Sequence, residues 1–188
     1  PSIGGVGLIK NYKNMITMNF KEINNLVLVI GKTEGHIDQS LFSRTILDEK
    51  NGPPPEVNLF NEKNNGESLL SLIDKGFIKS AHDISLGGLL TALSKMCISG
   101  NKGIKLKKSK NLIHEIEYFF AEDQGRYIVE INPDKINEVS KILDKNSVHY
   151  EELGIIVEKD MIINEKTKVT IDELSSSNTK WLSNYMSN

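Results

Sequence analysis

The sequence contains little cysteine and little arginine. Cys97 is the single cysteine among 188 residues, so no disulfide can form within the chain, and we expect a reducing, cytoplasmic location. Cys97 falls on the apolar side of a predicted helix, which favours a small buried hydrophobic residue over a nucleophile. Arginine occurs only at Arg44 and Arg126, and the other basic residues are lysines. Bidentate binding of a phosphate or carboxylate could therefore come from these two positions only.

The sequence also lacks the features of membrane-spanning, secreted, nucleic-acid-binding and metal-binding proteins. No apolar run is long enough to span a bilayer, and the first residues lack the basic start and apolar stretch of a signal peptide. The net charge is −2, which argues against nucleic-acid and membrane partners. No His, Cys or carboxylate residues have metal-ligand spacing, so we expect no metal site within this chain. The chain begins with proline, which is compatible with a piece cut from a longer polypeptide.

What is present indicates an ordinary globular domain. Hydrophobic residues make up 38% of the chain, which is enough to build a core. The apolar run from Leu26 to Ile30, closed by Gly31, predicts a strand that is buried on both faces. Helical spacing predicts helices over residues 41–46, 57–75, 85–99, 133–143 and 172–185. Apolar or alternating runs predict strands over residues 3–9, 76–83, 103–106, 126–131, 148–157 and 161–169.

This order of elements predicts an α/β fold with a mixed β-sheet and packed helices. We expect a single domain over residues 1–188, in which residues 1–25 form a lead-in segment and residues 171–188 form a C-terminal helix. Asn64-Asn65-Gly66 interrupts the pattern of residues 57–75, so that stretch predicts either one helix or two.

Residues 112–120 are ambiguous between helix and strand. The alternation of Ile116, Tyr118 and Phe120 favours a strand. Together with residues 126–131 it predicts a hairpin around a five-residue polar tip, or two strands joined by a loop.

The stretch from Ser80 to Gly100 is the most informative part of the chain. Ser85 is the predicted N-cap of its helix, because its hydroxyl can accept an N–H of the first turn. Gly87 and Gly88 fall in that first turn, where each glycine costs about 1 kcal/mol relative to alanine. The pair indicates that another group comes close to the backbone. That group is a neighbouring strand or domain, or an anion such as a phosphate, which a helix N-terminus attracts.

His82 and Asp83 come just before this helix and would lie on the same rim. A structural hydrogen bond is the more common role for such a pair, and a catalytic dyad is the alternative.

Five phrases, in this order and spacing, carry a resemblance over nearly the whole chain. They are GVGLI at residues 5–9, GHIDQS at 35–40, GPP at 52–54, HDISLGGL at 82–89 and EDQGRY at 122–127. Together they resemble the C-terminal domain of the large subunit of phosphoribosylformylglycinamidine synthases, within the AIR synthase-like superfamily. Each motif alone is weak evidence for the family, but the five motifs in the same order and spacing are specific to it. These large subunits contain two AIR synthase-like halves, and the motifs of this chain resemble those of the second, C-terminal half.

The resemblance implies an activity for the whole enzyme. That enzyme is an ATP-dependent ligase that uses ATP, Mg²⁺ and ammonia to convert formylglycinamide ribonucleotide to its amidine in purine biosynthesis. ATP activates the amide oxygen as an iminophosphate, and a glutaminase subunit or domain supplies ammonia from glutamine. In this family the catalytic histidine and most ATP, Mg²⁺ and substrate contacts belong to preceding domains. The resemblance thus implies that this chain has no catalytic residue and binds neither ATP nor Mg²⁺ alone.

The partners that the resemblance implies are the upstream domains of the same large subunit, a glutaminase subunit and a small accessory subunit. A homodimer of the isolated domain is a further alternative. The candidate residues for phosphate or substrate binding, or for an interface, are His82, Asp83, Ser85, Gly87, Gly88, Glu122, Asp123, Gln124 and Arg126.

The triplet Glu122-Asp123-Gln124 matches the place of a substrate-binding Glu-Ser-Gln triplet in the first copy of the family. We favour the alternative that it is a polar loop, capping the sheet or bonding to a neighbouring domain. The chain departs from the family at Leu86 and Asn58, where Asp is usual, and at Asp38, where Gly is usual. Leu86 removes a carboxylate, so an acid or Mg²⁺ role there is excluded. Asp38 is expected to adopt left-handed backbone angles, which Asp tolerates.

Three functions follow from these observations. The leading one is a ligase domain with a structural role and no turnover of its own. The second is a phosphate- or nucleotide-binding module that uses the N–H groups of Gly87 and Gly88 together with Arg126. The third is an interaction domain that forms homodimers.

Overall fold

The protein is built around one mixed β-sheet. The computed structural model describes residues 4–9, 11–107, 113–164 and 167–187. The sheet has seven strands in the order β2-β4-β1-β5-β3-β6-β7, and only β3 and β6 pair in parallel among them. The strands are β1 Leu26–Ile30, β2 Ile78–Asp83, β3 Gly103–Leu106, β4 Tyr127–Ile131, β5 Tyr150–Val157, β6 Met161–Asn164 and β7 Thr167–Val169. The predicted fold class is confirmed.

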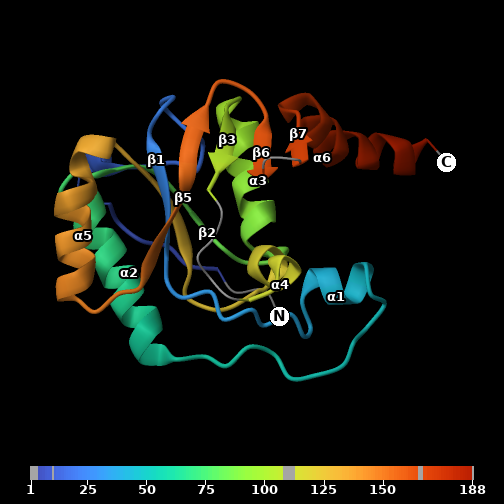
Figure 1. The fold of residues 1–188 in the computed structure, drawn as a ribbon, viewed down its shortest axis with the longest axis horizontal. Helices are drawn as coiled ribbons and strands as arrows, with labels where there is room; N and C mark the ends of the chain where they lie inside the picture. The colour runs from blue at the N-terminus through green and yellow to red at the C-terminus, as the bar shows by residue number, and fades with distance from the viewer. Residues whose placement is uncertain (1–3, 10, 108–112, 165–166, 188) are drawn as a thin grey trace.

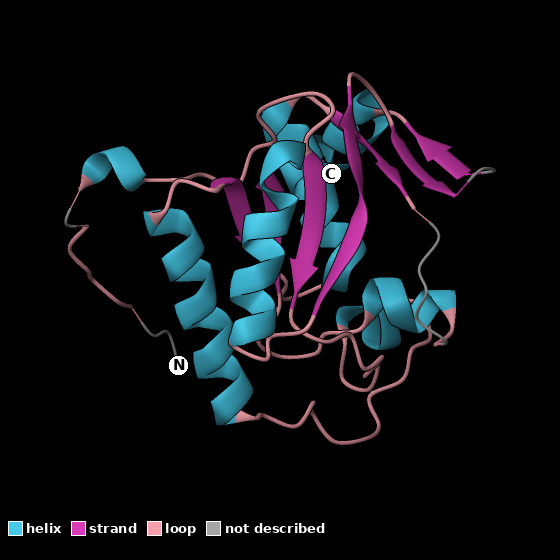
Figure 2. Ribbon diagram, turned by 60° about the vertical axis from the view of Figure 1, so that its left-hand side comes forward, coloured by secondary structure: helices cyan, strands magenta, loops and turns pink. Residues whose placement is uncertain are grey.

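Helices cover both faces of this sheet. Figures 1 and 2 show α2 and α5 on one face and α3 on the other, with α4 and α6 packed beside α3. The α-helices are α1 Leu41–Thr45, α2 Leu59–Asp74, α3 Gly88–Gly100, α4 Glu115–Phe120, α5 Ile136–Lys145 and α6 Ile171–Met186. Two short 3₁₀ helices, Tyr12–Asn14 and Pro133–Lys135, complete the described elements. Within the described part of the chain, no helix combines the length and the apolar character that a membrane crossing needs.

The interior strand β1 shows how the core is divided into two layers. Its side chains alternate between two apolar clusters, because successive residues of a strand point to opposite faces. Val27 and Val29 pack in the cluster beneath α3, and Leu28 and Ile30 pack in the cluster beneath α2 and α5. The strand is thus buried on both faces, as the uninterrupted apolar run predicts. Cys97 is fully buried in the α3 cluster, and burial raises the pKa of its thiol to about 12, as suits a hydrophobic residue rather than a nucleophile.

The strand predicted within residues 112–120 is wrong, because residues 115–120 form helix α4. His114 caps this helix, and the side chain of Glu117 accepts the His114 backbone N–H in return, which completes a capping box. Acidic residues in the first turn also favour the helix N-terminus. The hairpin with residues 126–131 is therefore absent, and β4 follows α4 after an irregular loop.

The stretch over residues 57–75, which predicted either one helix or two, forms a single helix, α2. Its middle is tied down by side-chain amides: Asn64 donates to the Asn146 carbonyl at 2.7 Å and Asn65 donates to the Gly125 carbonyl at 2.9 Å. These bonds, with Leu69 and Leu72 in the core, outweigh the weak helix propensity of Gly66.

The two ends of the chain differ from expectation in part. Residues 4–9 form no strand and are exposed, and residues 1–3 of the predicted lead-in strand lie outside the described residues. The backbone reaches the sheet later, where Thr17 makes an isolated parallel bridge to Ser80 on the edge strand β2. The strand predicted over residues 161–169 is a pair, β6 and β7, and the C-terminal helix is confirmed as α6.

A buried carboxylate holds the lead-in segment to the sheet. Glu130 on β4 has no exposed surface, and its oxygens accept four hydrogen bonds. The donors are the Lys21 N–H at 2.8 Å, the Glu22 N–H at 3.0 Å, the Asn25 amide at 2.7 Å and the Ser80 hydroxyl at 2.8 Å. The carboxylate thereby satisfies backbone donors that no strand partner reaches.

We predict that Glu130→Ala lowers the free energy of unfolding by about 2–4 kcal/mol, because it leaves buried donors without an acceptor. Urea unfolding followed by circular dichroism measures this loss. Glu158→Ala, at an exposed position, is the control and should change the stability by less than about 0.5 kcal/mol. Equal stability of the two variants would contradict the role given to Glu130.

Candidate functional site

The predicted site residues meet at one end of the sheet. Three segments gather there: residues 31–39 after β1, residues 84–88 before α3, and residues 121–126 before β4. The strand register brings them together, because Tyr127 pairs with Ile30 of β1 on one side and with Asp83 of β2 on the other.

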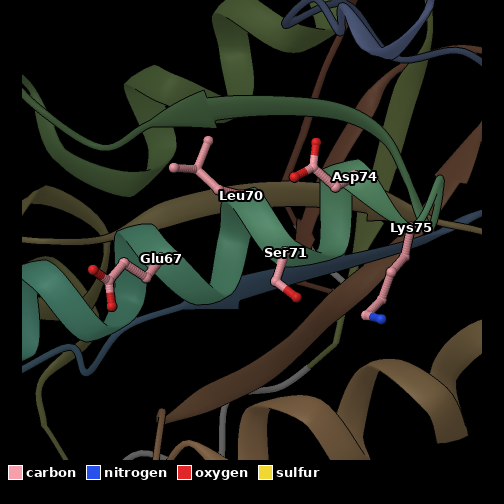
Figure 3. A pocket seen from close by; sticks show the side chains of 5 residues that line it. All are labelled: Glu67, Leu70, Ser71, Asp74 and Lys75. Carbon is pink, nitrogen blue, oxygen red and sulfur yellow. The ribbon is translucent and has the colours of Figure 1, made fainter. Parts of the chain in front are cut away.

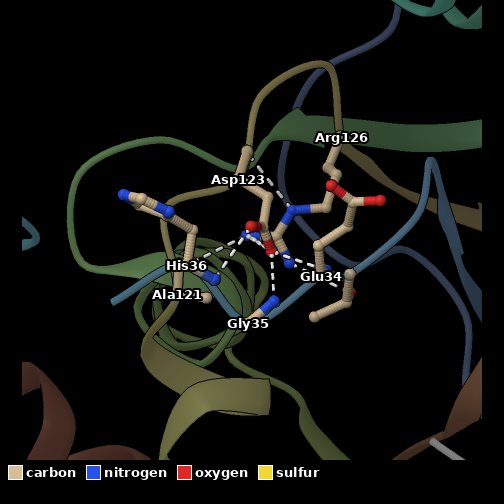
Figure 4. A network of polar contacts seen from close by, with 7 residues as sticks. Glu34, Gly35, His36, Ala121, Asp123 and Arg126 are labelled. Carbon is tan, nitrogen blue, oxygen red and sulfur yellow. Dashed lines mark hydrogen bonds and ion pairs between the residues drawn. The ribbon is translucent and has the colours of Figure 1, made fainter. Parts of the chain in front are cut away.

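The side chain of Asp123 accepts hydrogen bonds from three successive backbone N–H groups in the turn that follows β1. Its Oδ2 accepts the N–H groups of Glu34 at 3.0 Å and Gly35 at 3.1 Å, and its Oδ1 accepts the N–H of His36 at 3.0 Å. Figure 4 shows these backbone groups directed at the one carboxylate. The side chain is nearly buried, so these charge-assisted bonds are shielded from water.

Arg126 lies beneath the same carboxylate and is 1% exposed. Its guanidinium donates to the Thr33 hydroxyl at 3.0 Å, to the Ala121 carbonyl at 2.7 Å and to the Asp123 carbonyl at 3.3 Å. Its Nη2 also lies 3.8 Å from Asp123 Oδ2. Burial lowers the pKa of Arg126, and the Asp123 charge offsets part of this effect. The arginine therefore uses its donors on groups of this chain.

Glu122 joins the starts of two helices. Its Oε1 accepts the Gly87 N–H at 2.8 Å, at the start of α3, and the Leu41 N–H at 2.7 Å, at the start of α1. A carboxylate at a helix N-terminus is favoured by the helix dipole and by the free N–H groups. The anion attracted to the glycine pair is thus, in this structure, a side chain of the same protein.

The glycine pair sits at the helix boundary and is closely packed. Gly87 is the N-cap with φ +89°, and Gly88 is the first helical residue with φ +71°. The predicted N-cap Ser85 is wrong: its carbonyl accepts the Gly88 N–H at 3.0 Å, and α3 starts two residues later than that prediction requires. A Cβ on Gly88 would lie 2.7–2.8 Å from backbone atoms of residues 119–121. Only glycine fits both the angles and this approach.

His82 and Asp83 form a separate pair on the edge strand β2. His82 Nδ1 lies 3.1 Å from Asp83 Oδ1, and the Asp83 side chain is 61% exposed. His82 Nε2 is buried and has no hydrogen-bond partner among the described residues. The side chains of this pair make no hydrogen bond to the other predicted site residues within the described ranges.

A polar cleft of about 600 Å³ adjoins the Asp123 network. Its lining comes from the loop after β1, the start of α2 and the 121–126 loop: Lys32, Glu34, Gly35, His36, Pro55, Glu56, Asn58, Asn61, Glu62, Asn65, Asp123 and Gln124. Lys32 pairs with Glu34 at 2.8 Å, which leaves Glu56 and Glu62 without a basic side chain among the lining residues. The resulting negative balance disfavours a phosphate in this cleft.

A second hollow, shallow and of about 530 Å³, lies on the outward face of α2. Figure 3 shows its lining of Glu67, Leu70, Ser71, Asp74 and Lys75. None of the predicted site residues contributes to it. Among the described residues, no group of three or more His, Cys, Asp or Glu side chains has a geometry that could hold a metal ion.

The structure shows what stands at each of the three positions where the chain departs from the family pattern. Asn58 caps α2, because its side chain accepts the Asn61 N–H at 3.0 Å, and Asn serves this role as well as Asp. The expected left-handed angle at Asp38 is wrong, because the neighbouring Gln39 takes it instead, with φ +59°. Gln39 then donates to the carbonyls of Lys50 and Gly52. Leu86 is 54% exposed beside the glycine pair.

Sequence reasoning missed the groups that the candidate residues bind. Two of the three hydrogen-bond acceptors of Arg126, and the N–H donors to Glu122 and Asp123, are backbone atoms, which leave no signal in side-chain identity.

Comparisons with known proteins agree with this fold. The family described as "AIR synthase related protein, C-terminal domain" matches residues 22–164. "Phosphoribosylformylglycinamidine synthase subunit PurL" of Pelagibacter ubique is 66% identical over 188 residues, which are 100% of this chain and 26% of that protein. The protein of the same name from Bartonella henselae is 36% identical over 99% of this chain and 25% of its own length. The chain thus spans about a quarter of the curated relatives it matches.

Solved structures show the same fold. "T. maritima PurL complexed with FGAR" has a TM-score of 0.70 at 18% identity, over 87% of this chain and 30% of that chain. E. coli HypE, a hydrogenase maturation protein, has a TM-score of 0.60 at 15% identity, over 83% of this chain and 52% of its own.

We predict that Gly88→Ala is much more destabilising than Gly76→Ala. Both glycines have φ +71°, but a Cβ on Gly76 meets nothing within 4 Å, whereas on Gly88 it meets backbone. The backbone strain of about 1–2 kcal/mol is shared, and overpacking adds about 1–3 kcal/mol at Gly88. Thermal and urea unfolding measure the difference. Equal losses for the two variants would show that the close approach at Gly88 has no energetic consequence.

We predict that Asp123→Asn speeds hydrogen exchange at the N–H groups of Glu34, Gly35 and His36 by about 10- to 100-fold. Asparagine keeps one acceptor oxygen and presents an NH₂ group to the other donors, so hydrogen bonds worth about 1.5–3 kcal/mol are lost. Native-state exchange measured by NMR or mass spectrometry reports the change. Gln124→Ala, at the neighbouring exposed position, should leave these rates within about twofold. Unchanged exchange in the Asp123 variant would contradict the role given to that carboxylate.

Proposed function

Because the chain belongs to the family of AIR synthase-related C-terminal domains, we propose that it is one domain of a phosphoribosylformylglycinamidine synthase large subunit. The support is its similarity to PurL subunits along its whole length, at 66% identity in one relative. In this proposal the domain is the C-terminal copy, and it stabilises the subunit without supplying a catalytic group.

The proposed activity of the whole subunit is that of an ATP-dependent ligase. It would join ammonia, supplied from glutamine, to formylglycinamide ribonucleotide, with ATP and Mg²⁺ held mainly by preceding domains. T. maritima PurL has been solved in complexes with ATP and with FGAR, and a structure of T. maritima PurLQS is also similar to this chain. We accordingly propose upstream domains, a glutaminase subunit and a small accessory subunit as the partners of this chain.

One observation favours the structural role over a phosphate-binding module. The three charged residues of the 121–126 loop all bond to groups of this chain: Glu122 to helix starts, Asp123 to the turn after β1, and Arg126 to Thr33 and loop carbonyls. The Gly87 N–H, needed for an external anion, is already bonded. A phosphate at this helix start would have to displace Glu122 from two N–H groups.

The test uses the full-length polypeptide that contains this chain. We predict ATP-dependent formation of the amidine with ammonium as nitrogen donor. In that protein, Asp123→Asn should lower the thermal midpoint and kcat together, with KM for ATP and for the ribonucleotide within about twofold, because the residue shapes the loops rather than the substrate site. Glu158→Gln, at an exposed position, is the matched control.

Two outcomes would contradict this proposal in different ways. A full-length protein that folds but forms no amidine would refute the assignment to the synthase. A rise in KM of tenfold or more in the Asp123 variant, at an unchanged thermal midpoint, would instead make Asp123 a substrate-binding residue.

A further inference from the structure

Helix α6 is packed on the domain over its first turns only. Ile171 and Leu174 pack against the apolar cluster beneath α3. Every residue from 177 to 187 is exposed, and the large apolar side chains among them are Trp181 at 63%, Leu182 at 52%, Tyr185 at 72% and Met186 at 73%. Figure 1 shows α6 running from β7 away from the sheet, with its C-terminal end clear of the other elements.

The exposed side chains continue the stripe that the domain already buries. Residues seven apart lie on almost the same side of an α-helix, so Trp181 extends the line of Leu174. Tyr185 follows one turn later on the same side, and Leu182 and Met186 widen the stripe in one direction around the helix. A stripe of this kind normally faces a protein core along its full length. Here the domain covers the first part and leaves the second part open.

The open part of α6 combines exposed large apolar side chains with almost no charge. Between residues 175 and 187 only Lys180 is charged, and the other residues are apolar or carry small polar groups. Exposed apolar patches bounded by polar residues mark interaction sites. Permanent interfaces are more hydrophobic than transient ones, whose partners meet with the help of charge.

We propose that the outer half of α6, residues 178–186, is a docking surface for another domain of the same polypeptide. This inference rests on the proposed function. Relatives that align with the whole of this chain, α6 included, are about four times as long, since the chain is 26% of one and 25% of another. A covalently linked domain is present at high effective concentration and needs no charge to find the helix.

The glycine pair at α3 does not offer a comparable surface. Gly88 is closed by the backbone of residues 119–121, and the Gly87 N–H is bonded to Glu122. The α6 surface therefore gives the interface to the rest of the subunit a more specific location than the rim of the candidate site does.

Photo-crosslinking in the full-length polypeptide tests this proposal. Benzoylphenylalanine replaces Tyr185 in one variant and, as the control, Leu70, which is 62% exposed on the outer face of α2. The fold of each variant is first checked by circular dichroism, and its amidine formation is assayed separately. After irradiation, we expect the Tyr185 variant to yield a crosslinked peptide from outside the 188 residues, with no added mass on a denaturing gel. The Leu70 variant should yield none.

Every other outcome overturns the proposal. A crosslink that joins two copies, a crosslink to a separate subunit, a crosslink within residues 1–188, or no crosslink in an active protein each excludes intramolecular docking at α6. If Tyr185 replacement abolishes folding, Met186, which is 73% exposed on the same stripe, takes the probe with the same expected result. A full-length protein that folds without synthase activity refutes the proposed function itself, and the crosslink is then judged separately.

Discussion

Three backbone N–H groups converge on the carboxylate of Asp123, and the organisation of one end of the domain depends on this convergence. A turn with exposed N–H groups would otherwise need water or a ligand to satisfy them. Asp123 supplies the acceptor, and Arg126 beneath it supplies donors to Thr33 and to the carbonyls of the same loop. The loop after β1 and the loop before β4 are thus fixed to each other by charge-assisted bonds at the edge of the cleft.

Carboxylates that accept backbone N–H groups also occur at both ends of β4. Glu122, before the strand, accepts N–H groups at the starts of α1 and α3, and Glu130, near its other end, accepts N–H groups of the lead-in segment. All three carboxylates bind backbone donors that lie outside the sheet ladders. They let irregular segments pack against a sheet without leaving buried donors unpaired. This arrangement gives these charged residues a structural role, as acceptors for the backbone N–H groups of irregular segments.

Much of the fold could be predicted from the sequence because its signals are local. The strand Leu26–Ile30 and the apolar stripe of α3 follow directly from the spacing of apolar side chains. The glycine pair predicted that another group comes close to the backbone, and at Gly88 the backbone of residues 119–121 does so. The failures have tertiary causes. A capping box turned an alternating segment into α4, and Glu122 from 35 residues away took the place expected for the Ser85 cap. The partners of Asp123 are backbone groups, so no side-chain pattern could identify them.

The central claim is that the anion-binding potential of the glycine helix start is already satisfied by this chain's own Glu122. Isothermal titration calorimetry of the folded 188-residue protein with ATP and with formylglycinamide ribonucleotide tests it most directly. The account predicts no saturable heat at millimolar ligand, with circular dichroism confirming the fold. A one-to-one binding isotherm with a dissociation constant well below millimolar, lost in Gly88→Ala at retained fold, would contradict it.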